Sequence, residues 1–241
     1  MSTPAMPSES FSHPSSFAER ARNLLTRLDY RRADSDEDLD RIINLRYRAY
    51  LREGAIDKSE SERLTDSFDG LDNAYNFGIY LEDKLISALR IHHINAAKPY
   101  SPAVESFGDI LKPLIAAGKT LIDPNRFVAD FDLSRHHPEI PFLTLRIAHL
   151  ASLHFDADIV TMTVRAEHQA FYKRGLFGQV LCPPRTYPLL SKPISLLAVD
   201  FRKELPRLEA RHPYWITSIA DRETLFGAGP TRGRPSKNEK I

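Results

Sequence analysis

Residues 166–177 read AEHQAFYKRGLF, and this stretch says more about the fold than any other part of the 241-residue chain. It follows a run of β-branched and apolar residues, 159–165, that is typical of a buried strand. Its composition and spacing predict a short helix over 166–174 that ends at Gly175, since glycine commonly follows a helix end. A second strand-like run, 176–182, comes next. We therefore expect strand, short helix and strand in succession.

The rest of the chain alternates helix-like and strand-like segments. Residues 36–52 carry apolar side chains at helical spacing behind a capping serine, and 138–155 is apolar nearly all round, as in a buried helix. The polar segment 53–72 predicts a long loop, and such loops inside a compact domain are often functional. This order predicts an α/β fold with three layers around a mixed sheet. The remaining predicted elements are helices 17–28, 101–118 and 202–211 and strands 28–33, 73–81, 85–94, 120–131 and 194–201, the fourth of these strands being interrupted at Asp123-Pro124.

Composition excludes several classes of protein. Apolar residues make up 42% of the chain, enough for a sizeable core, and the net charge of +1 argues against a bulk nucleic-acid binder. The lone cysteine, Cys182, rules out a disulfide framework and a zinc site built on several thiolates, which fits a cytoplasmic protein. No segment approaches the roughly 18 apolar residues of a membrane helix. The histidines lack metal-ligand spacing, so we expect no metal site.

The distribution of glycine weighs against a nucleotide cofactor. A doubly wound nucleotide fold needs a glycine-rich turn between a strand and a helix, because the backbone must approach the phosphates closely. No glycine occurs between Gly118 and Gly175, so the predicted buried helix is entered without such a turn.

Ionisable residues in apolar or strand-like surroundings are the candidate functional residues. They are Arg46 on the first long helix, Asp66 and Asp69 in the loop, Arg90 at the end of a hairpin strand, and Asp123 with Arg126 three residues later. Their spacing alone favours an ordinary buried ion-pair network over a binding site. Tyr172 is likewise more typical of a core residue with a hydrogen-bonded hydroxyl.

Residues 164–177 resemble the last conserved segment of the GNAT acyltransferase superfamily, in which a Phe-Tyr pair precedes Gly-Phe. Here Gly175 and Leu176 are exchanged, while Phe177 keeps its offset from Tyr172. The chain lacks the glycine-rich pyrophosphate loop of most GNAT enzymes. In this it resembles the branch that contains acyl-homoserine-lactone synthases and long-chain N-acyl amino acid synthases, which take acyl groups from acyl carrier protein. The resemblance covers residues 40–201, and the branch's pattern of arginines and acidic residues matches the six candidates above.

This resemblance implies a GNAT-like three-layer α/β/α sandwich around a mixed, splayed sheet. It also implies an N-acyltransferase that moves a fatty-acyl group from a thioester to the amine of an amino acid or related small amine. The donor would be acyl carrier protein, or else coenzyme A, and no cofactor would stay bound. An alternative is a non-catalytic GNAT-like protein that only binds a ligand or carrier.

Each chemical step of that reaction needs a particular kind of side chain. Asp123 is the first candidate for the base that deprotonates the amine, and Glu167 is the second. Arg90 or Arg126 would grip the substrate carboxylate, with Asp66 and Asp69 holding the arginines. Tyr172 would protonate the departing thiolate. Phe127, Phe131, Phe142, Leu143 and Ile147 would line the acyl-chain pocket, although core packing explains each of them as well.

A partner surface and the chain ends complete the expectations. A basic surface for an acidic carrier protein would consist of Arg135, His136, His137, Lys173, Arg174 and Arg185, although ordinary solvated charge fits them equally. We expect a disordered tail over 1–16, the acyltransferase domain over 17–211 and an extension over 212–241. Within the extension, Arg232-Gly233-Arg234-Pro235 resembles an AT-hook, whose extended arginines suit the narrow minor groove of A·T-rich DNA, so weak association with DNA is a minor alternative.

Overall fold

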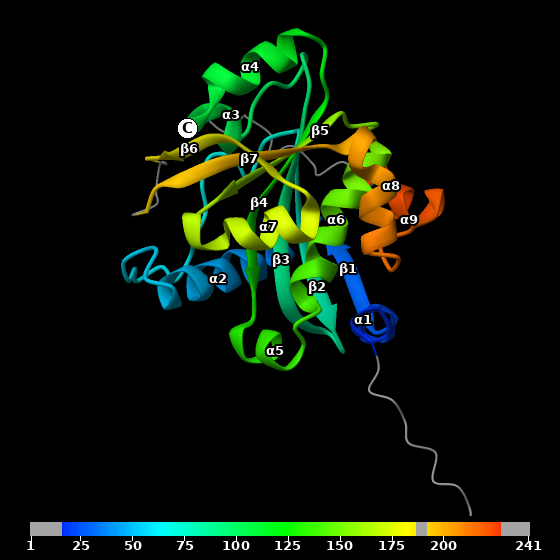
Figure 1. Ribbon diagram of the computed structural model, residues 1–241. Helices are drawn as coiled ribbons and strands as arrows, with labels where there is room; N and C mark the ends of the chain where they lie inside the picture. Colours follow the sequence, from blue (N-terminus) through cyan, green and yellow to red (C-terminus); the bar gives the residue numbers. More distant parts are fainter. Residues whose placement is uncertain (1–15, 187–191, 228–241) are drawn as a thin grey trace, which may run out of the picture.

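The computed structural model describes residues 16–186 and 192–227 (Figure 1). Residues 1–15 of the predicted tail and the AT-hook-like Arg232–Pro235 lie outside the described residues. Within the described ranges, seven strands form one sheet in the order β1-β2-β3-β4-β5-β7-β6. The strands are β1 (Leu28–Arg32), β2 (Ala74–Leu81), β3 (Lys84–Ile94), β4 (Leu121–Ala129), β5 (Ile159–Val164), β6 (Gln179–Arg185) and β7 (Ile194–Asp200). Because β4 and β5 run parallel while the other neighbours are antiparallel, the sheet is mixed, as predicted.

The sheet opens into a fork between β4 and β5. These strands pair only at Leu121–Ile159 and Ile122–Val160, and beyond that point they separate. Pro124 is the second β4 residue after the last pair. It has no N–H to donate, so its position at the fork costs no ladder hydrogen bond toward β5. The predicted strand is therefore not interrupted at Asp123-Pro124, and β4 runs through to Ala129.

The irregularity in β4 lies at Arg126 instead. The pairing with β3 shifts register between Ala88–Val128 and Arg90–Asn125, so β4 carries one more residue than β3 across this interval. Arg126 has a φ of 53°, a left-handed conformation that is uncommon outside glycine. Such a bulge bends a strand and redirects its side chains. It lets two consecutive residues serve one cluster, with Asn125 bonded to Arg90 and Arg126 bonded to the loop residue Asp66.

Helices cover both faces of the sheet, giving the predicted three-layer architecture. On one face α2 (Asp36–Arg52) packs against β3 and β4 through a cluster that includes Ile42, Leu45 and Ala88, with α3 (Pro102–Ser106) and α4 (Gly108–Ala116) on a separate cluster. On the other face lies α6 (Ile140–His154), so that β3 and β4 run between α2 and α6 (Figure 1). The remaining helices are α1 (Phe17–Leu25), α5 (Phe131–His136), the 3-10 turn η1 (Ala166–His168), α7 (Gln169–Leu176), α8 (Phe201–Arg211) and α9 (Ile219–Phe226).

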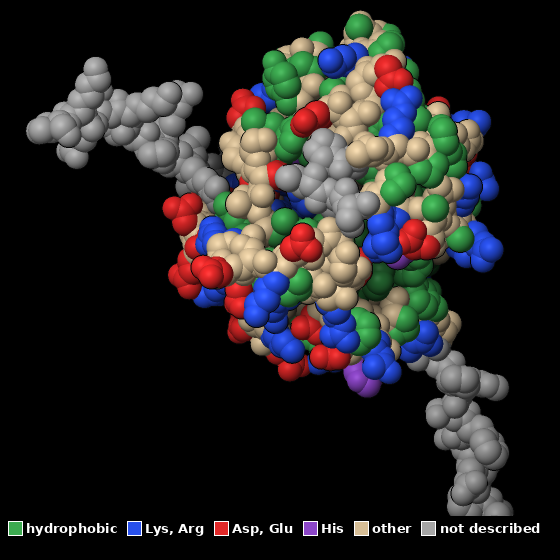
Figure 2. Space-filling model, turned by 90° about the vertical axis from the view of Figure 1, so that its left-hand side faces the viewer, with side chains coloured by type: hydrophobic (Ala, Val, Ile, Leu, Met, Phe, Trp, Pro, Cys, Tyr) green, Lys and Arg blue, Asp and Glu red, His purple; other side chains and the backbone are tan. Residues whose placement is uncertain are grey.

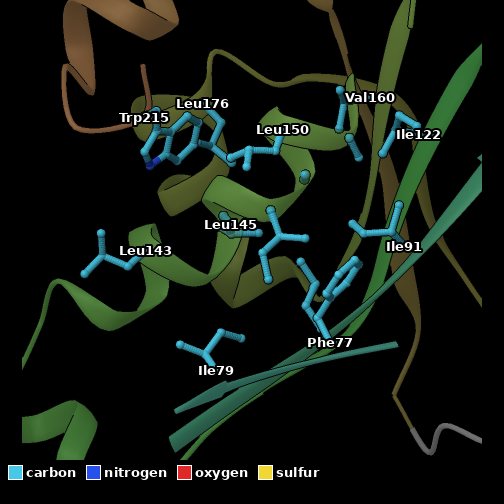
Figure 3. Close-up of a cluster of buried hydrophobic side chains, with 14 of the residues drawn as sticks. Phe77, Ile79, Ile91, Ile122, Leu143, Leu145, Leu150, Val160, Leu176 and Trp215 are labelled. Atoms are coloured by element: carbon cyan, nitrogen blue, oxygen red, sulfur yellow. The ribbon is translucent and has the colours of Figure 1, made fainter. Parts of the chain in front are cut away.

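The largest core cluster lies between α6 and the sheet. Phe77 and Ile91 from the strands point toward Leu145 and Leu150 on α6 (Figure 3). The 15 residues of α6 are apolar on nearly every side because the helix is buried on nearly every side. Burial at this level is the main favourable term in folding.

Several predicted boundaries differ from those observed. The expected helix over 101–118 is two helices that meet at Phe107, and α5 and α9 were not predicted. The folded body also continues past residue 211, where the sequence suggested that the domain ends. Tyr214, Trp215, Leu225 and Phe226 are buried in the main core. The segment 212–227 is held in place by tertiary packing against this core, which no local sequence pattern predicts.

Candidate active site

The long loop between α2 and β2 folds around its own acidic residues. Asp69 Oδ2 accepts hydrogen bonds from the Asp66 N–H at 3.1 Å and the Thr65 hydroxyl at 3.0 Å. Asp66 Oδ1 accepts one from the Phe68 N–H at 3.0 Å. Aspartate commonly closes turns in this way, because its short side chain reaches backbone groups two or three residues away. The loop thereby holds two carboxylates over the β3–β4 region.

Three arginines from different elements meet these carboxylates. Arg46 of α2 donates to Asp69 Oδ1 at 2.6 Å and to Asn76 Oδ1 on β2 at 2.6 Å. Arg90 of β3 donates through Nη1 to Asp69 Oδ1 at 2.8 Å. It also makes a two-pronged contact with Asp66, at 2.6 and 3.1 Å. The structure thus joins loop, helix and strands through charge-assisted hydrogen bonds.

Arg126 completes the cluster from the bulge in β4. Its Nε and Nη2 donate to Asp66 Oδ2 at 3.0 and 2.6 Å. The side chains of Asp66 and Asp69 are only 5% and 6% exposed, and Arg46 and Arg90 are fully buried. Burial by itself raises the pKa of Asp66, but the hydrogen bonds and charges of Arg90 and Arg126 outweigh it and hold that pKa well below its usual range. Both acids are therefore ionised at neutral pH.

The charges of the cluster do not cancel. Three arginines face two aspartates, which leaves one uncompensated positive charge in a desolvated place. Arg90 uses four of its five N–H groups, because its Nε binds Asn125 Oδ1 at 2.6 Å and its Nη atoms make three hydrogen bonds to Asp66 and Asp69. Arg126 gives two of its five N–H groups to Asp66, and Tyr50, whose ring centre lies 5.5 Å from the guanidinium, is a further hydrogen-bonding partner. Of the two arginines predicted to bind a carboxylate, Arg126 has more N–H groups left to offer.

Beside this cluster is a cavity of about 860 Å³ at the open end of the fork. Its wall comes from the end of α2, from β4 between Pro124 and Ala129, from α5, from the end of β5, and from η1 and α7. Arg90 and Arg126 line it together with other charged side chains, whereas Leu45, Phe127 and Phe171 are apolar wall residues. A large, partly apolar cavity with a few convergent polar groups is the usual form of a small-molecule site.

Two phenols stand in this cavity close to Arg126. Tyr172 of α7 and Tyr50 of α2 both line it. Burial raises the pKa of Tyr172, and the neighbouring phenol of Tyr50 raises it further, so the Tyr172 hydroxyl stays protonated at neutral pH. Tyr172 is therefore held as a hydrogen-bond donor inside the cavity.

Neither predicted base lies in the cavity wall. Asp123 is fully buried behind it, where its carboxylate accepts hydrogen bonds from the Ala103 N–H at 3.3 Å and the Thr161 hydroxyl at 3.2 Å. Burial raises the pKa of Asp123. Glu167 is exposed on η1 and pairs with Arg165 at 3.3 Å. Its own backbone N–H and nearby positive charges lower its pKa.

The predicted acyl-pocket residues divide into two groups. Phe127 and Phe131 line the cavity, as expected of pocket residues. Phe142, Leu143 and Ile147 do not: Leu143 and Ile147 have no exposed surface and belong to the main core, and Phe142 packs against Phe17 at 5.3 Å between ring centres. These three residues are corrected to core residues. Helix α6 is apolar on almost all sides, so its sequence does not reveal which side chains face a cavity.

The residues of the predicted basic surface lie on or next to three separate elements, α5, α7 and β6. Arg185 makes two hydrogen bonds to Asp109, at 2.7 and 2.9 Å, which neutralise its charge. Arg135 stacks near Phe131 on α5, while Lys173 and Arg174 belong to α7. On the face that Figure 2 presents, Lys and Arg side chains alternate with Asp and Glu. His136 and His137 end α5.

Sequence reasoning missed the neutral partners of the cluster. The arginines also bind neutral side chains, since Arg46 donates to Asn76 and Arg90 donates to Asn125. The Asn125 amide in turn lies 3.0 Å from His92 Nδ1. Burial lowers the pKa of His92 to about 3, so it is neutral. The sequence pattern that could have identified these partners is a polar residue at alternate positions of strands that are otherwise apolar. That pattern places such side chains on one face of the sheet, beneath α2.

Two further classes of feature are missing from the described part of the chain. Residues 16–186 and 192–227 contain no group of three or more His, Cys, Asp or Glu side chains placed to hold a metal ion. None of the helices within those ranges has the length and apolar character needed to cross a membrane.

Comparison with known proteins identifies the family. The model of the family described as "N-acyl amino acid synthase FeeM" matches residues 41–200. The chain belongs to this family. It is therefore an acyltransferase of the N-acyl amino acid synthase type, and the fork, the buried ion cluster and the adjoining cavity lie in the matched segment. A search of curated protein sequences gives no significant match.

Solved structures agree on the fold. FeeM from uncultured soil microbes, described as an N-acyl amino acid synthase, superposes with a TM-score of 0.60 at 19% identity, covering 78% of this chain and 98% of that one. BjaI, described as a coenzyme A-dependent acyl-homoserine lactone synthase with SAM and isopentyl-CoA, gives 0.54 at 16% identity, covering 80% and 90%. The acyl-homoserine lactone synthase LasI gives 0.51 at 15%, covering 71% and 88%. The GNAT-like fold expected from residues 164–177 is confirmed.

Proposed function

We propose that this FeeM-family enzyme transfers a fatty-acyl group from the thioester of an acyl carrier protein to the amine of an amino acid whose carboxylate is held by Arg126. The observation that carries the proposal is the position of Arg126. It lines the cavity, two of its nitrogens are fixed by Asp66, and the cluster behind it has one positive charge in excess. A substrate carboxylate would balance that charge, and guanidinium is the side chain best suited to bind it.

The choice of acyl carrier protein over coenzyme A as donor rests on the missing glycine-rich pyrophosphate loop. Coenzyme A carries a pyrophosphate that GNAT enzymes usually bind on a glycine-rich loop, and no glycine occurs from residue 119 to residue 174. A carrier protein presents its thioester without that nucleotide. The acyl chain would lie along the apolar wall that includes Phe127 and Phe171.

The chemistry follows from the side chains in place. The amine attacks the thioester carbon, the tetrahedral intermediate collapses, and the carbon–sulfur bond breaks to release a thiol. Tyr172, whose phenol remains protonated, would give its proton to the departing thiolate. Asp123 would receive the amine proton through an intervening water, since its raised pKa suits a group that must bind a proton. Glu167, exposed and with a lowered pKa, is the weaker candidate.

A reconstituted assay tests the donor and the role of Arg126. The purified chain is incubated with dodecanoyl carrier protein or dodecanoyl-CoA and a mixture of the twenty amino acids, and N-dodecanoyl products are measured by mass spectrometry. We expect products from the carrier-protein donor, with a turnover number at least tenfold above that with coenzyme A. Equal or better use of dodecanoyl-CoA refutes the donor assignment.

The matched variants are Arg126→Gln and Arg185→Gln. Both arginines bind an aspartate through two nitrogens, but Arg185 does so on the surface and outside the cavity wall. Arg126→Gln should raise KM for the amino acid by about tenfold or more, because a charge-assisted pair contributes on the order of 1.5–3 kcal/mol. Arg185→Gln should leave KM unchanged. An unchanged KM in a folded Arg126→Gln protein would remove the arginine from acceptor binding.

A further inference from the structure

A second, smaller cavity of about 40 Å³ lies on the α6 side of the sheet. Its wall includes Leu145 of α6, Val160 and Met162 of β5, and Leu176, all of them apolar. Trp215 also lines it, and its indole N–H is already bound to the Phe142 carbonyl at 3.0 Å. Figure 3 shows Trp215 beside Leu176, above the helix that carries Leu145 and Leu150. The cavity is therefore apolar apart from one side chain.

That side chain is His149, which is 3% exposed. Neither of its ring nitrogens has a hydrogen-bond partner among the described residues. The Glu209 carboxylate is the nearest charged group, with Oε1 3.6 Å from Nε2, which is too long for a hydrogen bond. The rings of Phe201 and Trp215 flank the imidazole at 5.6 and 5.5 Å. A buried polar group without a hydrogen-bond partner is rare in proteins, so His149 is expected to bind a partner that the chain itself does not supply.

His149 is neutral in this environment. Burial lowers its pKa to about 4, and the positive charge of Arg146 adds to the effect. A neutral imidazole carries one hydrogen-bond donor and one acceptor. A hydroxyl group, which can donate or accept, can pair with whichever ring nitrogen of His149 faces the cavity. The cavity is also large enough for a group of that size.

The small cavity adjoins the active-site cavity across the fork. Pro124 lines both. Along β5, Val160 and Met162 face the small cavity, whereas Thr163 and Val164 line the larger one. Since β4 and β5 do not pair beyond Ile122–Val160, no ladder hydrogen bonds close the sheet at this point. Pro124 is therefore a wall shared by the two cavities at a point where the sheet is not closed.

We propose that the small cavity receives the distal part of the acyl chain and that His149 makes the enzyme select chains that carry a hydroxyl there. This inference rests on the proposed function, since it assigns an acyl chain to the adjoining cavity. It makes His149 a specificity-determining residue that is remote from the reacting atoms. The predicted substrate class is a fatty-acyl thioester hydroxylated at or near its end.

The only tryptophan of the chain lines this cavity, so binding can be measured without catalysis. Free ω-hydroxy fatty acids of 8, 10, 12 and 14 carbons, and the unsubstituted acids of the same lengths, are titrated against the full chain while tryptophan fluorescence is recorded. At the length that places the hydroxyl at His149, the hydroxylated acid should bind about 2- to 10-fold more tightly than its unsubstituted counterpart, the range expected for one buried hydrogen bond. A 3-hydroxy acid should gain nothing.

His149→Phe and His154→Phe are the matched variants. Both replace a histidine of α6, but His154 does not line the small cavity. The preference for the hydroxylated acid should disappear in folded His149→Phe and persist in His154→Phe. If no chain length favours the hydroxylated acid, or if His149→Phe keeps the preference, the inference is overturned and a water is the better partner for His149. If binding and preference are seen but no acyl amino acid forms from any thioester, the proposed function fails instead.

Discussion

Replacing Asp66 by Asn should destabilise the fold far more than any change of a surface carboxylate. The Asp66 carboxylate accepts two hydrogen bonds from Arg90 and two from Arg126, at 2.6 to 3.1 Å, and its side chain is 5% exposed. Asparagine keeps the size but removes the charge, so three buried arginines would face one aspartate. Removing one partner of a buried ion pair costs about 3–5 kcal/mol, because the other charges stay desolvated.

Asp109→Asn is the matched control. Asp109 also binds an arginine through two hydrogen bonds, but it is 58% exposed, and surface pairs contribute about 0–1 kcal/mol. Urea unfolding followed by circular dichroism should therefore show a loss of about 3–5 kcal/mol for Asp66→Asn. Asp109→Asn should cost about 1 kcal/mol or less. If the two variants lose the same stability, the buried cluster does not hold the loop to the sheet.

The pH dependence supplies a second check with a defined sign. The pKa of Asp66 in the folded chain lies below its unfolded value of about 4. The stabilisation from its ionised form is therefore present above pH 4 and is lost as the pH falls from 4 through the folded pKa. The gap in stability between wild type and Asp66→Asn should be constant near neutral pH and narrow below pH 4. A gap that widens on acidification would refute the assignment of the low pKa to this residue.

Three other perturbations have equally definite outcomes. Thr163→Trp places an indole in the large cavity at the fork and should lower kcat/KM at least tenfold while urea unfolding still shows a folded, cooperative protein. Phe226→Ala removes a ring that lies 5.2 Å from Phe77 in the core and should cost about 3–5 kcal/mol in urea unfolding, which a disposable C-terminal extension would not. Asp123→Asn should gain stability relative to wild type as the pH rises above about 4, since burial raises the folded pKa of Asp123 and its stabilising protonated form is lost as the pH rises through that pKa. A difference in stability that does not change with pH would contradict this.

The sequence was most informative where a local pattern determines the structure. The hairpin 73–94 and the helices at 36–52, 138–155 and 166–174 were predicted within a few residues, because each has its own hydrophobic period or cap. Helix α9 and the buried Trp215 were not predicted. Their order comes from packing against α6, which is distant in the sequence.

The charged residues of the cluster were predictable, but its neutral partners and its geometry were not. The structure brings Arg46, Asp66, Asp69, Arg90 and Arg126 into one bonded cluster, the buried ion-pair network that their spacing favours. The backbone at position 126 is left-handed, but the residue there is arginine and not glycine, so the sequence does not predict this conformation. Without that bulge, strict alternation would place Asn125 and Arg126 on opposite faces of β4. Sequence patterns of period two therefore cannot show that both side chains serve the same cluster.

The ion cluster and the fork depend on each other. Asp66 binds β3 through Arg90 and β4 through Arg126, so one loop carboxylate fixes the bulge from the side opposite to the core. The bulge lies on the β4 segment that has left β5, and the same segment forms a wall of the large cavity. In a continuous sheet, β5 would satisfy the edge of β4 with ladder hydrogen bonds. Here side-chain bonds to arginine hold this edge in place, and the space between the strands is left to the large cavity.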